Sequence, residues 1–185
     1  MKPFSTPEGR ACRLGAVLAS FVLLLACATG ISSQSKALVD YGGPFGPLSK
    51  NPEGFSGKVV LVGGRILELT TGSTVSEVTV LQHPLDVASD RPKAEKGSSG
   101  RFIIQTESFL DPEVFRRGYY ITVVGRIVGK REQQVGGHPI VLPRIDPLET
   151  KLWIPSAGSS GPSVSFGVGV GSGGSGGGVG VGTWF

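Results

Sequence analysis

The sequence predicts an all-β fold, a small OB-like β-barrel of five or six strands with one short helix, over residues 54–156. Short β-branched and aromatic runs recur there roughly every 10–20 residues, separated by Gly, Pro, Asp and Ser, as in all-β barrels and sandwiches. No window holds a helical hydrophobic stripe of more than one or two turns. A length of about 100 residues favours the barrel, and a sandwich is the alternative.

Six segments carry the strand pattern. They are KVVLVGGRILELT (58–70), STVSEVTVLQHPL (73–85), RFIIQTES (101–108), YYITVVGRIVGKRE (119–132), HPIVLPRI (138–145) and KLWIP (151–155). Glycines lie within or beside them at Gly63, Gly64, Gly125, Gly129, Gly136 and Gly137. Glycines so placed are expected to form the bulges or sharp bends that let a small barrel close.

The one helix is expected within FLDPEVFRRG, residues 109–118. Asp111 is a residue type that caps helices, and Pro112 suits the first helical position. Gly118 comes where the helix would end. This segment is therefore the predicted helix between strands.

The first 26 residues have the parts of a bacterial secretory signal, a basic start followed by an apolar stretch over residues 14–26. As a helix this stretch rises only about 20 Å, too short for a hydrocarbon core of about 30 Å. It ends in LLAC (24–27), which predicts a lipobox with cleavage between Ala26 and Cys27. Cys27 is the predicted site of lipidation.

Cysteine usage also favours lipidation of Cys27. Cys12 lies in the segment that cleavage removes, so Cys27 keeps no cysteine partner for an internal disulfide. Several acyl chains such as palmitate on one residue hold a protein on a bilayer far better than a single chain. Ala28 stands where an acidic residue would suggest retention at the inner membrane. Resemblance to bacterial lipoproteins in general therefore implies the outer membrane, on its periplasmic face. Soluble secretion is the alternative.

Two flanking segments complete the expected domain organisation. Residues 27–53 hold the lipid anchor and then a flexible tether broken by three prolines, although the part around Tyr41 to Leu48 is expected to pack on the domain. Residues 157–185 form a Gly/Ser-rich tail with too little apolar surface to order. Its last residues, Trp184 and Phe185, alternatively lie at the membrane interface or add to a sheet edge.

Composition and motifs indicate no enzyme, metal or nucleic-acid function. The signal accounts for +2 of the overall charge of +4, and the remaining +2 is too small to suggest nucleic acid. A metal or hydrolase site would need His83, His138 and Asp86 to converge, and no H-x-x-x-H, cysteine pair or G-x-S-x-G is present. We therefore expect no catalytic residue, no metal ligand and no cofactor.

Basic residues are denser in one part of the chain than elsewhere. They are Arg116, Arg117, Arg126, Lys130 and Arg131. A solvated edge, where charge discourages unwanted strand pairing, is the favoured interpretation. Contact with lipid phosphates or an anionic envelope polymer is the alternative.

Four stretches carry a resemblance to a known family. They are GKVVLVGGRI (57–66), SEVTVLQHPLD (76–86), GRFIIQTESFLDPEVFRRGYYITVVGRIVG (100–129) and LW (152–153). In order and spacing they resemble the Slp family, the starvation-inducible outer-membrane lipoproteins of Gram-negative bacteria, and FLDP followed by G-x-x-x-T-V-x-G-x-x-x-G is fairly specific. The resemblance implies an anchored small β-domain with no assigned catalytic residues.

The leading hypothesis is an outer-membrane lipoprotein, anchored in the membrane through Cys27, with a non-catalytic structural or stress-related role. An envelope polymer or another envelope protein is the expected partner. The alternative is a periplasmic barrel that carries a small or lipidic ligand. That alternative predicts a sizeable apolar cavity, whereas a core filled by its own side chains would count against it.

Overall fold

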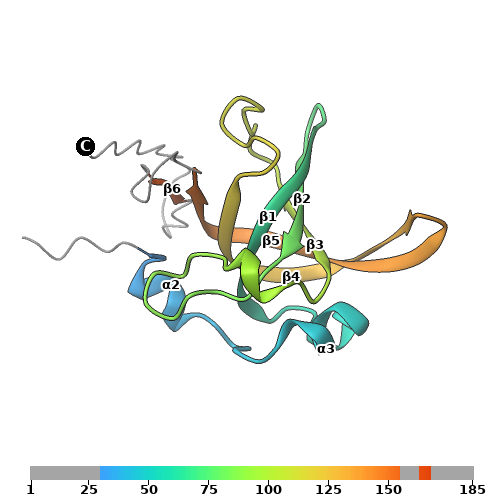
Figure 1. The fold of residues 1–185 in the computed structure, drawn as a ribbon, viewed down its shortest axis with the longest axis horizontal. Helices are drawn as coiled ribbons and strands as arrows, with labels where there is room; N and C mark the ends of the chain where they lie inside the picture. Colours follow the sequence, from blue (N-terminus) through green and yellow to red (C-terminus); the bar gives the residue numbers. More distant parts are fainter. Residues whose placement is uncertain (1–29, 155–162, 168–185) are drawn as a thin grey trace, which may run out of the picture.

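A computed structural model describes residues 30–154 and 163–167, and it contains a closed five-stranded barrel with a sixth strand at one edge (Figure 1). The strands are β1 (Val59–Thr71), β2 (Ser76–Gln82), β3 (Arg101–Thr106), β4 (Tyr120–Val135), β5 (His138–Trp153) and β6 (Ser163–Gly167). The helical elements are α2 (Ser33–Ala37), α3 (Phe45–Lys50) and the 3-10 turns η1 (Pro52–Phe55) and η2 (Ala94–Lys96). The predicted all-β, OB-like barrel is confirmed.

The sheet runs in the order β3-β2-β1-β4-β5-β6, and the barrel closes where β3 meets β5. The closing contact is parallel and short, with Ile103 opposite Arg144 and Ile104 opposite Ile145. The neighbouring pairs β1–β2, β1–β4, β2–β3 and β4–β5 are antiparallel. Because closure leaves few unpaired strand edges, the barrel itself offers little for strand-to-strand aggregation.

β4 and β5 continue past the barrel as a long hairpin, residues 131–141, which projects to the right in Figure 1 and is called the arm below. Its two-residue turn consists of Gly136 and Gly137, both at positive φ (59° and 81°), as a type I′ turn requires. The segments expected separately at 138–145 and 151–155 are thus one strand. The strand tolerates Pro143 and Pro147 because most of this stretch is an outer edge of the sheet, where a missing N–H is tolerated.

Glycines allow the closest approaches between strands. A Cβ at Gly64 would lie 1.9 Å from the carbonyl oxygen of Leu81, and one at Gly125 would lie 2.5 Å from that of Asp146. The β4–β5 register shifts just before Gly125 and again before Gly129, so both glycines mark bulges, as the sequence predicts.

Side chains from the strands fill the barrel. In β2 every second residue from Ser76 to Gln82 is buried, the pattern of a strand with one face on a core. The core draws on all five barrel strands: Val60, Val62, Ile66, Val78, Val80, Phe102, Ile104, Ile121, Val123, Ile127, Ile145 and Leu152. The barrel interior is therefore occupied by the chain's own side chains.

Residues 31–55 are packed on the barrel. The sequence analysis expects a flexible tether here, with packing only around Tyr41 to Leu48, and the packed segment is longer than that. Phe45 and Leu48 of α3 enter the core, and Leu48 is 1% exposed. Asp40 accepts a hydrogen bond from the Val59 amide (2.9 Å), and Tyr41 forms a parallel bridge with Val60. Helices this short have no detectable sequence period and form through tertiary packing, which explains why the local pattern did not reveal them.

The helix expected at residues 109–118 is a single turn instead. Asp111 does cap it, because its carboxylate accepts from the Glu113 amide (2.8 Å) and its carbonyl accepts from the Phe115 amide (2.9 Å). The turn goes no further because Phe115 is buried in the core and the Gly118 amide donates to the Ile66 carbonyl. Tertiary contacts thus override the local helix signals.

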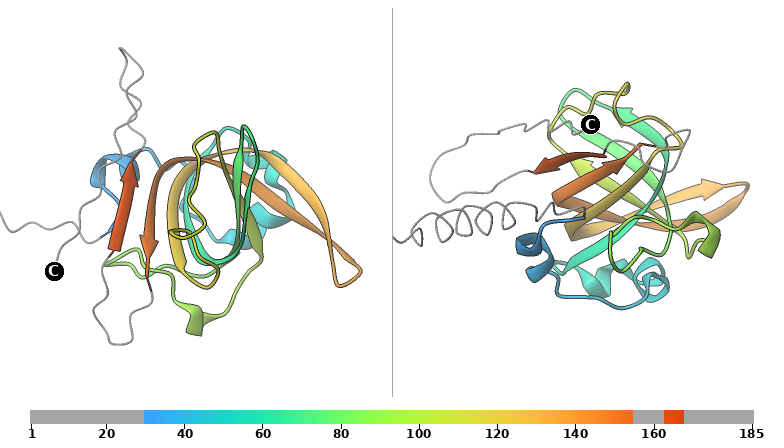
Figure 2. Two further views of the ribbon diagram at one scale, coloured as in Figure 1. Left: turned by 90° about the horizontal axis from the view of Figure 1, so that it is seen from above. Right: turned by 60° about the vertical axis from the view of Figure 1, so that its left-hand side comes forward.

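The tail expected to be structureless contributes a strand. β6 pairs antiparallel with the end of β5, from Glu149 opposite Gly167 to Trp153 opposite Ser163 (Figure 2). Strands can pair through backbone hydrogen bonds whatever their side chains, so the Gly/Ser-rich composition did not reveal β6. Trp184 and Phe185 lie outside the described residues.

Replacing Gly64 by Ala tests the close approach of β1 to β2. The new methyl group would overlap the Leu81 carbonyl, so we expect the free energy of unfolding to fall by about 2–3 kcal/mol in chemical denaturation. Gly46→Ala is the matched control, because nothing lies within 4 Å of its Cβ position and it sits in α3. Equal stabilities of the two variants would contradict this account of closure.

Candidate functional site

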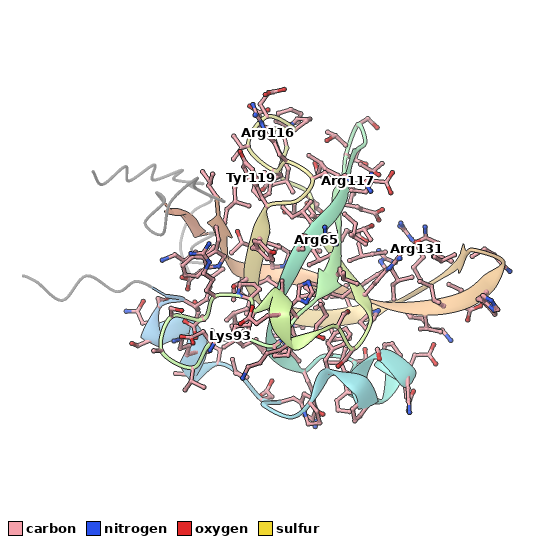
Figure 3. The ribbon with its side chains drawn as sticks, viewed as in Figure 1. Arg65, Lys93, Arg116, Arg117, Tyr119 and Arg131 are labelled. Carbon is pink, nitrogen blue, oxygen red and sulfur yellow. The ribbon has the colours of Figure 1, made fainter. Side chains whose placement is uncertain are left out.

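Ala26 and Cys27, the predicted cleavage and lipidation residues, lie outside the described residues. The chain is described from Gly30 onward, and residues 30–38 contact the barrel. We call this region the docking site: residues 30–38, the loop 86–91 that receives them, and Thr122, Glu149 and Trp153 of β4 and β5. α2 and this loop lie together at one end of the molecule, near Lys93 in Figure 3.

Asp90 is the centre of the docking site. It is 4% exposed, and its carboxylate accepts a hydrogen bond from the Ile31 amide (2.9 Å) and pairs with the Lys36 ammonium (2.6 Å). Its carbonyl accepts from the Thr122 hydroxyl (2.7 Å), whose oxygen accepts from the Trp153 indole (3.0 Å). A chain of hydrogen bonds thus runs from the barrel wall to the N-terminal segment.

Local backbone chemistry fits this arrangement. Asp90 has φ of 60°, a left-handed conformation that Asp and Asn tolerate better than other side chains. A Cβ at Gly30 would lie 2.2 Å from the Asp90 carboxylate, so glycine lets the chain pass close to it.

The loop 86–91 is held from within by Asp86. Its carboxylate accepts from the amides of Ala88 and Ser89 (both 3.0 Å) and pairs with Lys93 (2.5 Å). The hydrogen bond from Lys93, together with those from Ser89 and Ala88, holds the pKa of Asp86 well below its usual range. Asp86, considered in the sequence analysis as part of a metal or catalytic site, instead organises the loop.

Glu149 forms a second attachment point. It accepts from the Ser32 amide (3.0 Å) and the Ser32 hydroxyl (2.5 Å), and Ser32 itself caps α2. Burial alone would raise the pKa of Glu149, but hydrogen bonds from Ser32 and Ser35 outweigh burial and lower it. The carboxylate therefore prefers its charged form, which is the form that binds Ser32.

Two cations surround the Trp153 ring. The Lys151 ammonium lies 4.7 Å from its centroid and the Arg91 guanidinium 5.9 Å, both within cation–π range. Burial lowers the pKa of Lys151. Trp153 is thus fixed by a hydrogen bond at its indole N–H and by charge over its ring.

The two histidines lie apart. His83 is buried at the end of β2, with Nδ1 2.6 Å from the Gly97 carbonyl, whereas His138 is exposed next to the turn of the arm. Among the described residues, no three His, Cys, Asp or Glu side chains gather as metal ligands would. Within the same residues, no helix has the length and apolar character needed to cross a membrane.

Four of the five basic residues singled out from the sequence have partners at separate places. Arg116 pairs with Glu113 on the β3–β4 loop, and Arg131 pairs with Glu77 where the arm leaves the barrel (Figure 3). Lys130 lies 3.4 Å from Glu53 and from Glu132. Arg126 donates to the Gly57 carbonyl (2.7 Å). They do not form one cationic patch, which favours the interpretation of solvated, charged edges.

The sequence did not reveal that four residues come together in the docking site, because their contacts span 31 to 117 residues of sequence. These residues are Asp90, Thr122, Glu149 and Trp153. One signal was present: Asp86, Ser89 and Asp90 are turn-forming residues packed into one short stretch.

Substituting Asp90 tests the attachment of the N-terminal segment. Asp90→Asn keeps the backbone conformation and one acceptor oxygen but removes the charge that pairs with Lys36. We expect the free energy of unfolding to drop by about 1–3 kcal/mol in chemical denaturation. Glu113→Gln removes one member of an exposed pair and should change stability by less than about 1 kcal/mol. A loss no larger in Asp90→Asn would contradict the central role of Asp90.

The docking site should also respond to pH. Because folding lowers the pKa of Glu149, its contribution is complete above the unfolded glutamate pKa of about 4.3 and fades as the pH falls through the folded value. Glu149→Gln carries no such charge, so between about pH 5 and pH 3 the wild type should lose more stability than this variant in denaturation curves. Parallel losses would show that Glu149 does not contribute.

Comparisons with known proteins bear on the sequence resemblance. The chain matches the outer membrane lipoprotein Slp family over residues 24–166. It is 29% identical over 96 residues to an uncharacterized protein of Haemophilus influenzae, covering 52% of each chain. It is 31% identical over 88 residues to the uncharacterized lipoprotein YeaY of Escherichia coli, covering 48% of this chain and 45% of YeaY.

The chain therefore spans about half the length of the curated relatives that it matches. No solved structure matches it. The family match is much longer than either pairwise match and covers all five barrel strands as well as the docking site. The chain belongs to the Slp family of outer membrane lipoproteins.

Proposed function

We propose that Cys27 carries the lipid anchor of this protein and that its barrel has a non-catalytic structural or binding role on the periplasmic face of the outer membrane. The observation that carries the proposal is the extent of the family match, which begins at Leu24 and so includes the LLAC segment with Cys27. The family resemblance extends this proposal to a role under envelope stress.

The separation of the candidate catalytic residues supports a non-catalytic role. His83 is buried and hydrogen-bonded to Gly97, Asp86 is bound to Lys93 and the loop amides, and His138 lies at the arm. A nucleophile or general base has to lie within hydrogen-bond reach of its partner. His83 and Asp86 are instead each bound to other groups, and His138 lies on a different element from both.

The packed barrel core counts against a carrier that encloses its ligand. The described residues do offer a groove of about 350 Å³ on the outside, below the arm, with Leu81, Arg101, Val135 and Ile140 among its walls. A binding role, if the barrel has one, is therefore better placed on this outer surface than inside.

The intact mass of the membrane-extracted protein tests the anchor. We expect a chain that lacks residues 1–26 and carries acyl groups, and a Cys27→Ser variant that lacks them and leaves the membrane fraction. Cys12→Ser is the matched control and should be processed like the wild type, because Cys12 lies in the removed segment. An unmodified N-terminus at wild-type Cys27 would overturn the proposal.

A further inference from the structure

We propose that the docking site rests directly on the phospholipid bilayer, with Val87 and Leu38 in contact with the interface and the arm directed away from it. This inference rests on the proposed lipidation of Cys27 and adds an orientation to it. The sequence analysis expects a domain joined to the membrane by a long flexible tether. The inference instead has the domain held against the membrane in one orientation.

The first step is the reach of the chain. Three residue steps separate Cys27 from Gly30 in the sequence, and fully extended they span at most about 11 Å. The headgroup layer of one leaflet is about 5–8 Å thick. We place the lipid-bearing cysteine at the inner boundary of this layer, because its acyl chains lie in the hydrocarbon core. After the chain has crossed the headgroup layer, only a few ångströms of its extended length remain before Gly30.

The second step is that the fold takes up the chain immediately afterwards. The Ile31 amide is bound by Asp90, and the Ser32 amide by Glu149. Lys36 adds an ion pair with Asp90, and the Ile31 side chain is buried with Val59 and Val124. No length of chain between Gly30 and the barrel is therefore left to act as a spacer.

The third step is the surface that this geometry brings to the bilayer. Val87 is at the tip of the loop that holds Ile31 and is 97% exposed, and Leu38 ends α2 and is 55% exposed. The Lys36–Asp90 ion pair joins the two segments that carry them. Large apolar side chains in such a position are well suited to an interface with lipid.

Charge indicates which kind of contact this is. The docking site carries two basic side chains (Lys36 and Arg91) and three acidic ones (Asp86, Asp90 and Glu149). A surface with no net positive charge is not drawn to anionic headgroups. The contact is accordingly apolar, enforced by the short connection to the lipid, and should depend little on salt.

The orientation of the rest of the molecule follows. α2 and the arm lie at opposite ends of the longest axis (Figures 1 and 2). With the docking site on the membrane, the arm and the outer groove lined by Val135 and Ile140 face the aqueous space. That is where a partner of the protein would find them accessible.

The test uses the acylated protein without residues 1–26, in vesicles of phosphatidylethanolamine and phosphatidylglycerol. Val87→Cys introduces a thiol for an environment-sensitive fluorophore, while acylation blocks the thiol of Cys27. Quenching by spin-labelled lipids should be at least about threefold stronger at residue 87 than at the matched exposed control, His138→Cys on the arm. It should also persist at high salt, as expected for an apolar contact.

A second variant tests the role of the short connection. A Gly/Ser insertion of about 20 residues after Ala28 adds a mean span of about 25 Å and should reduce quenching at residue 87 to the level at residue 138. Equal quenching at the two positions in floated, acylated protein would overturn the inference while leaving the anchor intact. Undiminished quenching in the insertion variant would overturn the role of the connection. Protein that neither floats nor carries acyl groups would overturn the anchor and the inference together.

Discussion

The attachment of the Ile31 amide to the Asp90 carboxylate joins the two parts of this molecule, the barrel and the chain that leads to Cys27. Asp90 can serve because its backbone is fixed by Thr122 and, through Thr122, by Trp153. A buried carboxylate without partners would be costly, and here the Ile31 amide and the Lys36 ammonium both satisfy it. Without the N-terminal segment, the buried Asp90 carboxylate would lose both of these partners.

The closed barrel supplies the rigid frame for this joint. β4 and β5, which carry Thr122 and Trp153, are paired along their whole length and are fixed further by the β3–β5 contact. At the other end of the molecule the same two strands run on as the arm. One hairpin therefore connects the docking site with the arm. The orientation of the docking site consequently fixes the direction in which the arm points.

Much of this fold could be predicted from sequence, because strand alternation and glycine placement are local signals. The regular alternation in β2 and the bulges at Gly125 and Gly129 are examples. The helices α2 and α3 could not, since six residues or fewer form a helix only when packing stabilises them. Asp90 and Glu149 were hidden for a related reason: each becomes meaningful only when the barrel brings distant segments together.

The central claim is that the chain is folded onto the barrel from residue 31 onward, and amide hydrogen exchange of the membrane-extracted protein tests it most directly. The account predicts that the Ile31 and Ser32 amides exchange slowly, as strand amides such as that of Val123 do, because Asp90 and Glu149 hold them. Exchange of both amides at the rate of an unstructured chain would contradict it and would return residues 27–53 to the role of a tether.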